Sequence, residues 1–168
     1  SRPRGPPDLP AKRNDVPQIC VAISTALAES RTKTIDHGEE MLTGDMLRRS
    51  AYRFPRKPAI LWNGTALSYR DLDARSNQLA HALLGLGLKP GAKVAMLSRN
   101  RTEYGIVFFG ASRTGYVLVN VSVLYAPEEL AFVLDKADAE VLIFEDLFAE
   151  KVRAVGAMAD ITGRRRAE

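Results

Sequence analysis

The residues best placed for chemistry are polar side chains that directly follow three predicted strands. Ser98 to Asn100 follow one apolar strand, Asn120 to Tyr125 follow the next, and Glu145 with Asp146 follows a third. In open α/β sheets, ligands usually bind beyond the carboxyl ends of the strands. These three segments are therefore the candidate binding positions, although their residue types alone do not define a reaction.

The glycines of the chain do not form a nucleotide-binding motif. Gly85, Gly87 and Gly91 precede a predicted strand, whereas the glycines of a dinucleotide fingerprint follow one. Gly110 and Gly115 have the separation of phosphate-loop glycines, but no Lys-Ser or Lys-Thr pair follows them. We interpret the first three glycines as helix caps and turns.

Nucleophile and base candidates also lack a supporting context. Ser98, Ser112 and Ser122 lie outside any Gly-x-Ser-x-Gly sequence, so the chain shows no nucleophile elbow. His81 lies away from the apolar stripe of its predicted helix, and we predict a solvated surface histidine rather than a catalytic base.

Two pairs of carboxylates are close together in the sequence. They are Asp71 with Asp73, and Glu145 with Asp146, and adjacency alone does not indicate acid–base chemistry. We predict that they cap helices or are solvated. Asn100 could line a pocket, but capping the next helix is a sufficient role for it.

Composition describes an ordinary globular chain with one cysteine. The 168 residues are 46% hydrophobic and 26% charged, which suits one domain. Cys20 has no partner for an intrachain disulfide, and no Cys/His cluster has zinc-site spacing. The longest apolar runs are much shorter than the roughly 20 residues that a transmembrane helix needs. We therefore predict a cytoplasmic protein.

The net charge of +4 is concentrated early in the chain. Arg48, Arg49, Arg53, Arg56 and Lys57 could attract anionic lipid, phosphate or nucleic acid. We predict a solvated helix face and loop, on the expectation that no aromatic side chains interleave with the basic ones for base stacking. Peripheral contact with a membrane stays open, and a nucleic-acid partner is not expected.

The segment from Leu67 to Leu97 contains the clearest structural signals. Ser68 is a good N-cap, and Asp71 has capping-box spacing. An apolar stripe follows on one side of the helix, and the opposite side carries Asn77 and His81. The stripe consists of Leu72, Ser76, Leu79, Leu83 and Leu86. Glycines then end the helix, and Val94 to Leu97 is apolar without alternation, which indicates a strand covered on both faces.

The remaining elements alternate strand and helix. A first helix begins at Thr43, and Asn63-Gly64 predicts a type I′ hairpin. A nearly all-apolar helix spans Glu103 to Arg113, with Asn100 as its expected cap. Further predicted elements are strands at Tyr116–Val121 and Val141–Phe144, a helix from Pro127, and a last helix at Leu147–Met158. This order predicts an α/β fold with a parallel sheet and covering helices.

Three segments are expected along the chain. Residues 1–40 are rich in proline and charge, and we predict a disordered or irregular extension in which Ile19 to Ala28 forms a short helix or strand. Residues 41–158 form the folded unit, and residues 159–168 a polar tail.

Three ordered blocks of the folded unit resemble a known family. They read LSYRDLDARSNQLAHALLGLGLKPGAKVAMLSRNRTEY, FFGASRTGYVLVNVS and APEELAFVLDKADAEVLIFE. Together they resemble the beginning of an adenylate-forming (AMP-binding) enzyme and are most similar to acyl-CoA synthetases of the fatty-acid CoA ligase type, over roughly Met41 to Asp146. Ser122-Val123 departs from the Asn-Pro that this family generally shows, which could loosen a turn.

The resemblance implies a two-step ligation. ATP with Mg²⁺ would activate a fatty or other carboxylic acid as an acyl-adenylate, and the CoA thiol would then displace AMP. In that family the phosphate loop, the aromatic-Thr-Glu segment, the ribose-binding aspartate and a C-terminal lysine do this work, and the 168 residues contain none of these motifs. We therefore assign no catalytic, cofactor-binding or metal-binding residue, and expect an inactive N-terminal fragment with none of the three cofactors bound. The alternatives are an adenylating enzyme that loads a carrier protein, and a non-catalytic nucleotide- or RNA-binding module.

Overall fold

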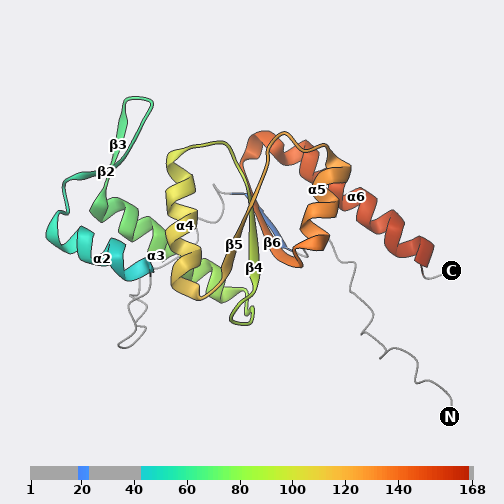
Figure 1. The fold of residues 1–168 in the computed structure, drawn as a ribbon, viewed down its shortest axis with the longest axis horizontal. Helices are drawn as coiled ribbons and strands as arrows, with labels where there is room; N and C mark the ends of the chain where they lie inside the picture. The colour runs from blue at the N-terminus through green and yellow to red at the C-terminus, as the bar shows by residue number, and fades with distance from the viewer. Residues whose placement is uncertain (1–18, 23–42, 167–168) are drawn as a thin grey trace, which may run out of the picture.

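The protein is described by a computed structural model, which covers the backbone of residues 19–22 and 43–166 and the side chains of residues 43–157 (Figure 1). The strands are β1 (Ile19–Ala22), β2 (Pro58–Trp62), β3 (Thr65–Ser68), β4 (Lys93–Leu97), β5 (Val117–Val121) and β6 (Ala139–Phe144). The helices are α2 (Thr43–Arg53), α3 (Tyr69–Gly85), α4 (Thr102–Thr114), α5 (Pro127–Lys136), the 3₁₀ helix η1 (Asp146–Phe148) and α6 (Ala149–Arg166).

The main sheet is parallel, as the sequence predicted, and has the strand order β1-β6-β4-β5. The three predicted strands are therefore neighbours, and β4 lies between the other two. Strand β1 adds a fourth, parallel to β6, with Ile19 opposite Val141 and Ala22 opposite Phe144. It comes from the Ile19 to Ala28 stretch, which the sequence left open between helix and strand.

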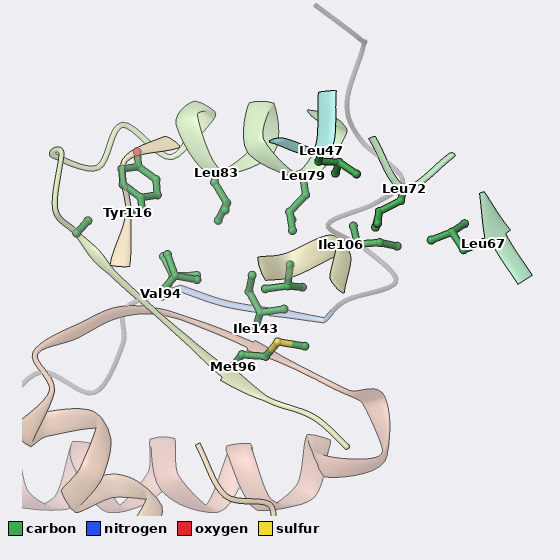
Figure 2. Close-up of a cluster of buried hydrophobic side chains, with 13 residues drawn as sticks. Leu47, Leu67, Leu72, Leu79, Leu83, Val94, Met96, Ile106, Tyr116 and Ile143 are labelled. Carbon is green, nitrogen blue, oxygen red and sulfur yellow. The ribbon is translucent and has the colours of Figure 1, made fainter. Parts of the chain in front are cut away.

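Helices cover both faces of this sheet (Figure 1). Alternate residues of β4 point to opposite sides, so Val94 and Met96 pack with α3 and α4, whereas Ala95 and Leu97 pack with α5 and α6. Figure 2 shows the first of these clusters, with leucines of α3 lying over side chains of β4 and β6. The unbroken apolar sequence of β4 is thus explained by burial on two faces.

Helix α3 begins as predicted but packs on more than one side. The Ser68 hydroxyl accepts from the Asp71 N–H at 3.2 Å and donates to the Asp71 carboxylate at 2.6 Å, which confirms the N-cap. The helix contacts α4, α2 and the β2–β3 hairpin. Asn77, predicted to point outward, is consequently buried, and the prediction of a single packed side was wrong.

The close approach of α3 and α4 depends on a glycine. A Cβ at Gly110 would lie 2.9 Å from Leu79 Cδ2, nearer than van der Waals contact allows. Gly110 is therefore a packing residue. Most of the apolar side chains of α4 are covered, as a nearly all-apolar helix requires, but Phe108 is 41% exposed.

The predicted turns are present. Asn63 and Gly64 have φ of 51° and 78°, the positive values of a type I′ turn, and the hairpin forms a separate two-stranded sheet. Gly87 and Gly91 also have positive φ, as the predicted caps and turns require, whereas Gly85 is the last residue of α3 and not its cap. Gly115, the C-cap of α4, has positive φ as well.

Two helix boundaries differ from the prediction. Helix α4 has Arg101 as its N-cap, with no side-chain capping bond, so the predicted capping role of Asn100 was wrong. Helix α6 starts at Ala149 after η1 and continues to Arg166, past the predicted end at Met158 and into the stretch expected to be a polar tail.

Candidate functional site

The sheet has a topological switch point between β4 and β6. The chain leaves β4 toward α4 on one face, and leaves β6 toward α6 on the other. The order of β5, β4 and β6 is that of the first three strands of flavodoxin-like sheets, in which the ligand crevice lies between the corresponding strands. The carboxyl ends of β4 and β6 are therefore where the fold itself would place a binding site.

An ion-pair cluster occupies this edge. The Glu145 carboxylate accepts from Arg99 Nη2 at 2.7 Å and Nε at 3.4 Å, from the Arg99 backbone N–H at 3.3 Å, and from Arg101 Nη1 at 2.8 Å. The Glu145 backbone N–H donates to the Leu97 carbonyl at 3.0 Å, which aligns the ends of the two strands. Glu145 is only 5% exposed, whereas 57% of the Arg99 side chain is exposed.

The arginines control the ionisation of this carboxylate. Hydrogen bonds from Arg99, helped by Arg101 and opposed by burial, lower the pKa of Glu145 from 4.5 to about 2. The same contacts raise the pKa of both guanidinium groups above its ordinary value. A general base needs a pKa near the working pH, so Glu145 is unsuited to that role near neutrality. Its position suits it to holding two cations at the mouth of the crevice.

A hollow of about 470 Å³ opens next to the cluster. It is lined by Arg99, Asn100 and Arg101 from the loop after β4, and by Trp62 and Asn63 from the hairpin turn. Asn100 is thus a pocket-lining residue rather than a cap. Two carboxylates balance the two arginines at this hollow, because Glu145 pairs with both and Arg101 Nε also lies 3.4 Å from the Glu103 carboxylate. The hollow is therefore polar and rich in N–H donors rather than strongly positive.

The structure brings together two of the three predicted segments. Arg99 and Glu145 meet directly, whereas the loop after β5 is tied to α6 by Lys151 Nζ, which donates to the carbonyls of Val123 and Tyr125, at 2.7 Å each. In that loop the Ser122 hydroxyl accepts from the Leu124 N–H at 3.2 Å, a bond that closes the turn. Glu145 is the N-cap residue of η1, but its side chain makes no capping bond and is buried and paired instead, so the prediction of a solvated or capping carboxylate was wrong for this side chain.

A second arginine–carboxylate pair lies inside the helical layer. Arg113 is 5% exposed, and its Nη2 donates to the Asp73 carboxylate and to the Gly44 carbonyl, the latter at 3.3 Å. Arg113 Nε has no hydrogen-bond partner. Gly44 lies so close that a Cβ there would be 2.6 Å from Arg113 Cγ. Asp73 is therefore paired, and the prediction of a solvated or capping Asp73 was wrong.

Other candidates are not part of the hollow. Ser98 is buried at the end of β4, and its hydroxyl donates to the Arg99 carbonyl at 2.9 Å. The Ser112 hydroxyl donates to the Phe108 carbonyl at 2.7 Å within α4. His81 is half-buried on α3, so it is less solvated than the sequence predicted.

The Glu145 carboxylate is occupied by arginines rather than open to a metal ion. Mg²⁺ is bound by carboxylate and water oxygens, but the Glu145 carboxylate already accepts N–H groups from two arginines. Within residues 43–157, no three His, Cys, Asp or Glu side chains are grouped as metal ligands would be. In the same part of the chain, no helix has the length and apolarity to cross a membrane.

The described residues thus form an open α/β domain with a parallel sheet and a polar hollow beside the carboxyl end of β4. The chain belongs to the AMP-binding enzyme family, whose family model matches residues 47–166. It is 36% identical over 112 residues to the long-chain-fatty-acid–CoA ligase of Escherichia coli O6:H1, which covers 66% of this chain and 20% of that protein. The chain thus spans about a fifth of the length of the curated relatives it matches.

The chain is also similar to a ligase with a different acceptor and to a solved structure. The fatty acid–[acyl-carrier-protein] ligase ScoC of Streptomyces coeruleorubidus is 36% identical over 103 residues, which are 61% of this chain and 20% of that protein. Among solved structures, the Mycobacterium tuberculosis fatty acyl CoA synthetase is 30% identical with a TM-score of 0.65, covering 69% of this chain and 24% of that one. The fold is therefore that of the N-terminal part of these ligases.

Proposed function

We propose that this chain supplies the N-terminal part, residues 41–158, of an ATP-dependent acid–thiol ligase. Such an enzyme activates a carboxylic acid, here a fatty acid, as an acyl-adenylate and transfers the acyl group to CoA. The observation that carries the proposal is the match to long-chain-fatty-acid–CoA ligases over 112 residues, together with the same fold. The single cysteine leads us to place the reaction in the reducing cytoplasm.

The role of this segment in the reaction is to build a framework. In phosphate chemistry of this kind, positioned cations stabilise the charge that develops on the phosphates, and Mg²⁺ supplies that chemistry when it is bound. The described residues contribute a rigid sheet edge, with Arg99 and Arg101 held by Glu145. We propose that the 168-residue chain by itself is inactive, since it contains none of the catalytic motifs that the resemblance implies.

A segment exchange tests this function. Residues 41–158 replace the equivalent segment of the Escherichia coli ligase, and fatty-acid-dependent ATP–pyrophosphate exchange and acyl-CoA formation are measured. We expect activity in the chimera and none in the isolated chain. The unmodified ligase and a ligase without the segment are the controls. Exchange activity in the isolated chain, or a folded but inactive chimera, contradicts the proposal.

A second candidate acceptor is a carrier-protein thiol. The chain is 36% identical to the fatty acid–[acyl-carrier-protein] ligase and also 36% identical to the CoA ligase. This equal identity supports the carrier protein as a second candidate. The same chimera, supplied with CoA or with a phosphopantetheinylated carrier protein, separates the two acceptors. We expect CoA to be used in preference, and transfer to the carrier protein alone supports the alternative.

A further inference from the structure

The outward side of α2 and the loop that follows it form a basic and aromatic surface, called here the α2 surface. It consists of Arg48, Arg49, Tyr52, Arg53, Phe54, Arg56 and Lys57, all of which are exposed. Four of these residues line a hollow of about 540 Å³, namely Arg48, Arg49, Tyr52 and Arg53. Tyr52 is 89% exposed and Phe54 is 54% exposed. The sequence-based expectation that no aromatic side chains lie among these cations was therefore wrong.

The α2 surface carries a strong positive charge. Between Thr43 and Lys57 there are five basic residues and a single acid, Asp45, whose carboxylate pairs with Arg48 at 3.0 Å. The Lys57 ammonium lies 5.6 Å from the centre of the Phe54 ring, so cation and ring are presented together. A cluster of this size on an amphipathic helix is typical of proteins that bind anionic lipid head groups.

The opposite side of α2 attaches it to the domain. Gly44 and Leu47 are buried, and the helix contacts α3 and α4. The helix and the hairpin lie together at one end of the molecule, away from α5 and α6 (Figure 1). The α2 surface can therefore approach a flat partner without disturbing the core.

We propose that the α2 surface docks the protein on an anionic lipid bilayer. The arginines and Lys57 pair with lipid phosphates, while Tyr52 and Phe54 enter the head-group region, where amphipathic and aromatic side chains are stabilised. Charge complementarity favours this occupant over a second copy of the chain, because a symmetric dimer through this surface would place like charges together. The inference rests on the surface alone and does not depend on the proposed ligase activity.

Vesicle co-sedimentation of the full 168-residue chain tests the proposal. The probes are vesicles of phosphatidylcholine, and vesicles of equal parts phosphatidylcholine and phosphatidylglycerol. We expect binding to the anionic vesicles only, weakened by salt. The double variant Arg49→Ala/Arg53→Ala should bind about 25-fold more weakly, from about fivefold per removed cation. The matched control is Arg75→Ala/Arg153→Ala, which removes two exposed arginines elsewhere and should bind nearly as well as the unmodified chain.

A fluorescence measurement tests the aromatic part. Trp62 is the sole tryptophan of the chain, so Tyr52→Trp in a Trp62→Phe background places one reporter on the α2 surface. We expect quenching by brominated lipid in anionic vesicles. Unchanged emission on bound vesicles overturns insertion of Tyr52.

Three outcomes overturn the docking proposal as a whole. They are failure to bind anionic vesicles, an equal loss of binding in the control pair, and binding of a single-stranded oligonucleotide that competes with the vesicles and depends on Arg49 and Arg53. The last outcome would assign the surface to nucleic acid. Circular dichroism melts establish that each variant is folded before its binding is compared.

Discussion

The two arginine–carboxylate groups of this domain are built in opposite ways. Around Arg113 the cation is buried and its partner Asp73 is partly exposed, whereas around Glu145 the anion is buried and the Arg99 and Arg101 guanidiniums face solvent. The first group joins α2, α3 and α4 inside the helical layer. The second joins two strand ends and opens onto a hollow. The difference lies in where the arginine is: the buried Arg113 directs its donors inward and links three helices, whereas Arg99 and Arg101 hold a buried carboxylate from the solvent side, where a ligand can reach them.

The largest expected effect is on the Arg113 group. Arg113→Ala removes a buried side chain and its bonds to Asp73 and Gly44, so the free energy of unfolding should fall by about 3 kcal/mol. Urea unfolding followed by circular dichroism measures it. Arg75→Ala, at an exposed position of α3, is the control and should change it by less than about 0.5 kcal/mol. If both variants lower the free energy of unfolding by similarly small amounts, Arg113 does not stabilise the packing of α2, α3 and α4.

The next effect is at the strand ends. Glu145→Gln removes the charge that holds two arginines, and we expect a loss of about 2 kcal/mol, smaller because both guanidiniums can be rehydrated. Glu140→Gln, which changes an exposed acid within β6, the strand that Glu145 follows, is the matched control. A loss as large as that of Arg113→Ala would remove the distinction between the two groups.

Acid pH should weaken the Glu145 group selectively. The pKa of Glu145 is about 2 in the folded protein and near 4.5 when unfolded, so its contribution is complete above pH 4.5 and is lost as the pH falls toward 2. The stability difference between the unmodified chain and Glu145→Gln should therefore shrink by about 1–2 kcal/mol below pH 4.5, discounted for the exposed arginines. Urea midpoints measured at a series of pH values test this. A pH-independent difference contradicts the pairing.

The smallest effect concerns one exposed arginine. Arg99→Gln should lower the urea midpoint less than Glu145→Gln does, because Arg101 still pairs with the carboxylate. It should nevertheless raise the pKa of Glu145, since Arg99 is the main cause of its depression. NMR titration of the Glu145 carboxyl measures the shift, and Arg75→Gln should leave it unchanged. An unaltered Glu145 pKa in Arg99→Gln would assign the depression to Arg101 instead.

Local signals predicted most elements, because they act over a few residues. The Ser68 cap, the Asn63-Gly64 turn and the proline that starts α5 are each recognisable from neighbouring side chains. A predicted helix boundary was wrong where two such signals competed. Asn100 has capping-box spacing, but Arg101 is the N-cap of α4 and Asn100 lines the hollow instead.

The sequence predicted where in the fold the candidate site lies, but not which of its side chains contact one another. The strand order placed polar segments at the carboxyl edge, and Arg99 and Glu145 do meet there. Nothing near Glu145 in the sequence indicates its partners, which are 44 and 46 residues away. Arg113 was missed for the same reason, since an arginine in an apolar helix carries no local sign of a carboxylate partner 40 residues distant.

By itself, the sequence determined that this is a parallel α/β unit resembling the start of an acyl-CoA synthetase, because hydrophobic period, caps and ordered motif blocks are properties of short stretches. The tertiary structure alone decided which charges are buried, which helix sides are covered and where the basic surface faces. Those properties depend on contacts between distant segments, and the free energy of a charge depends on whether those segments exclude water from it.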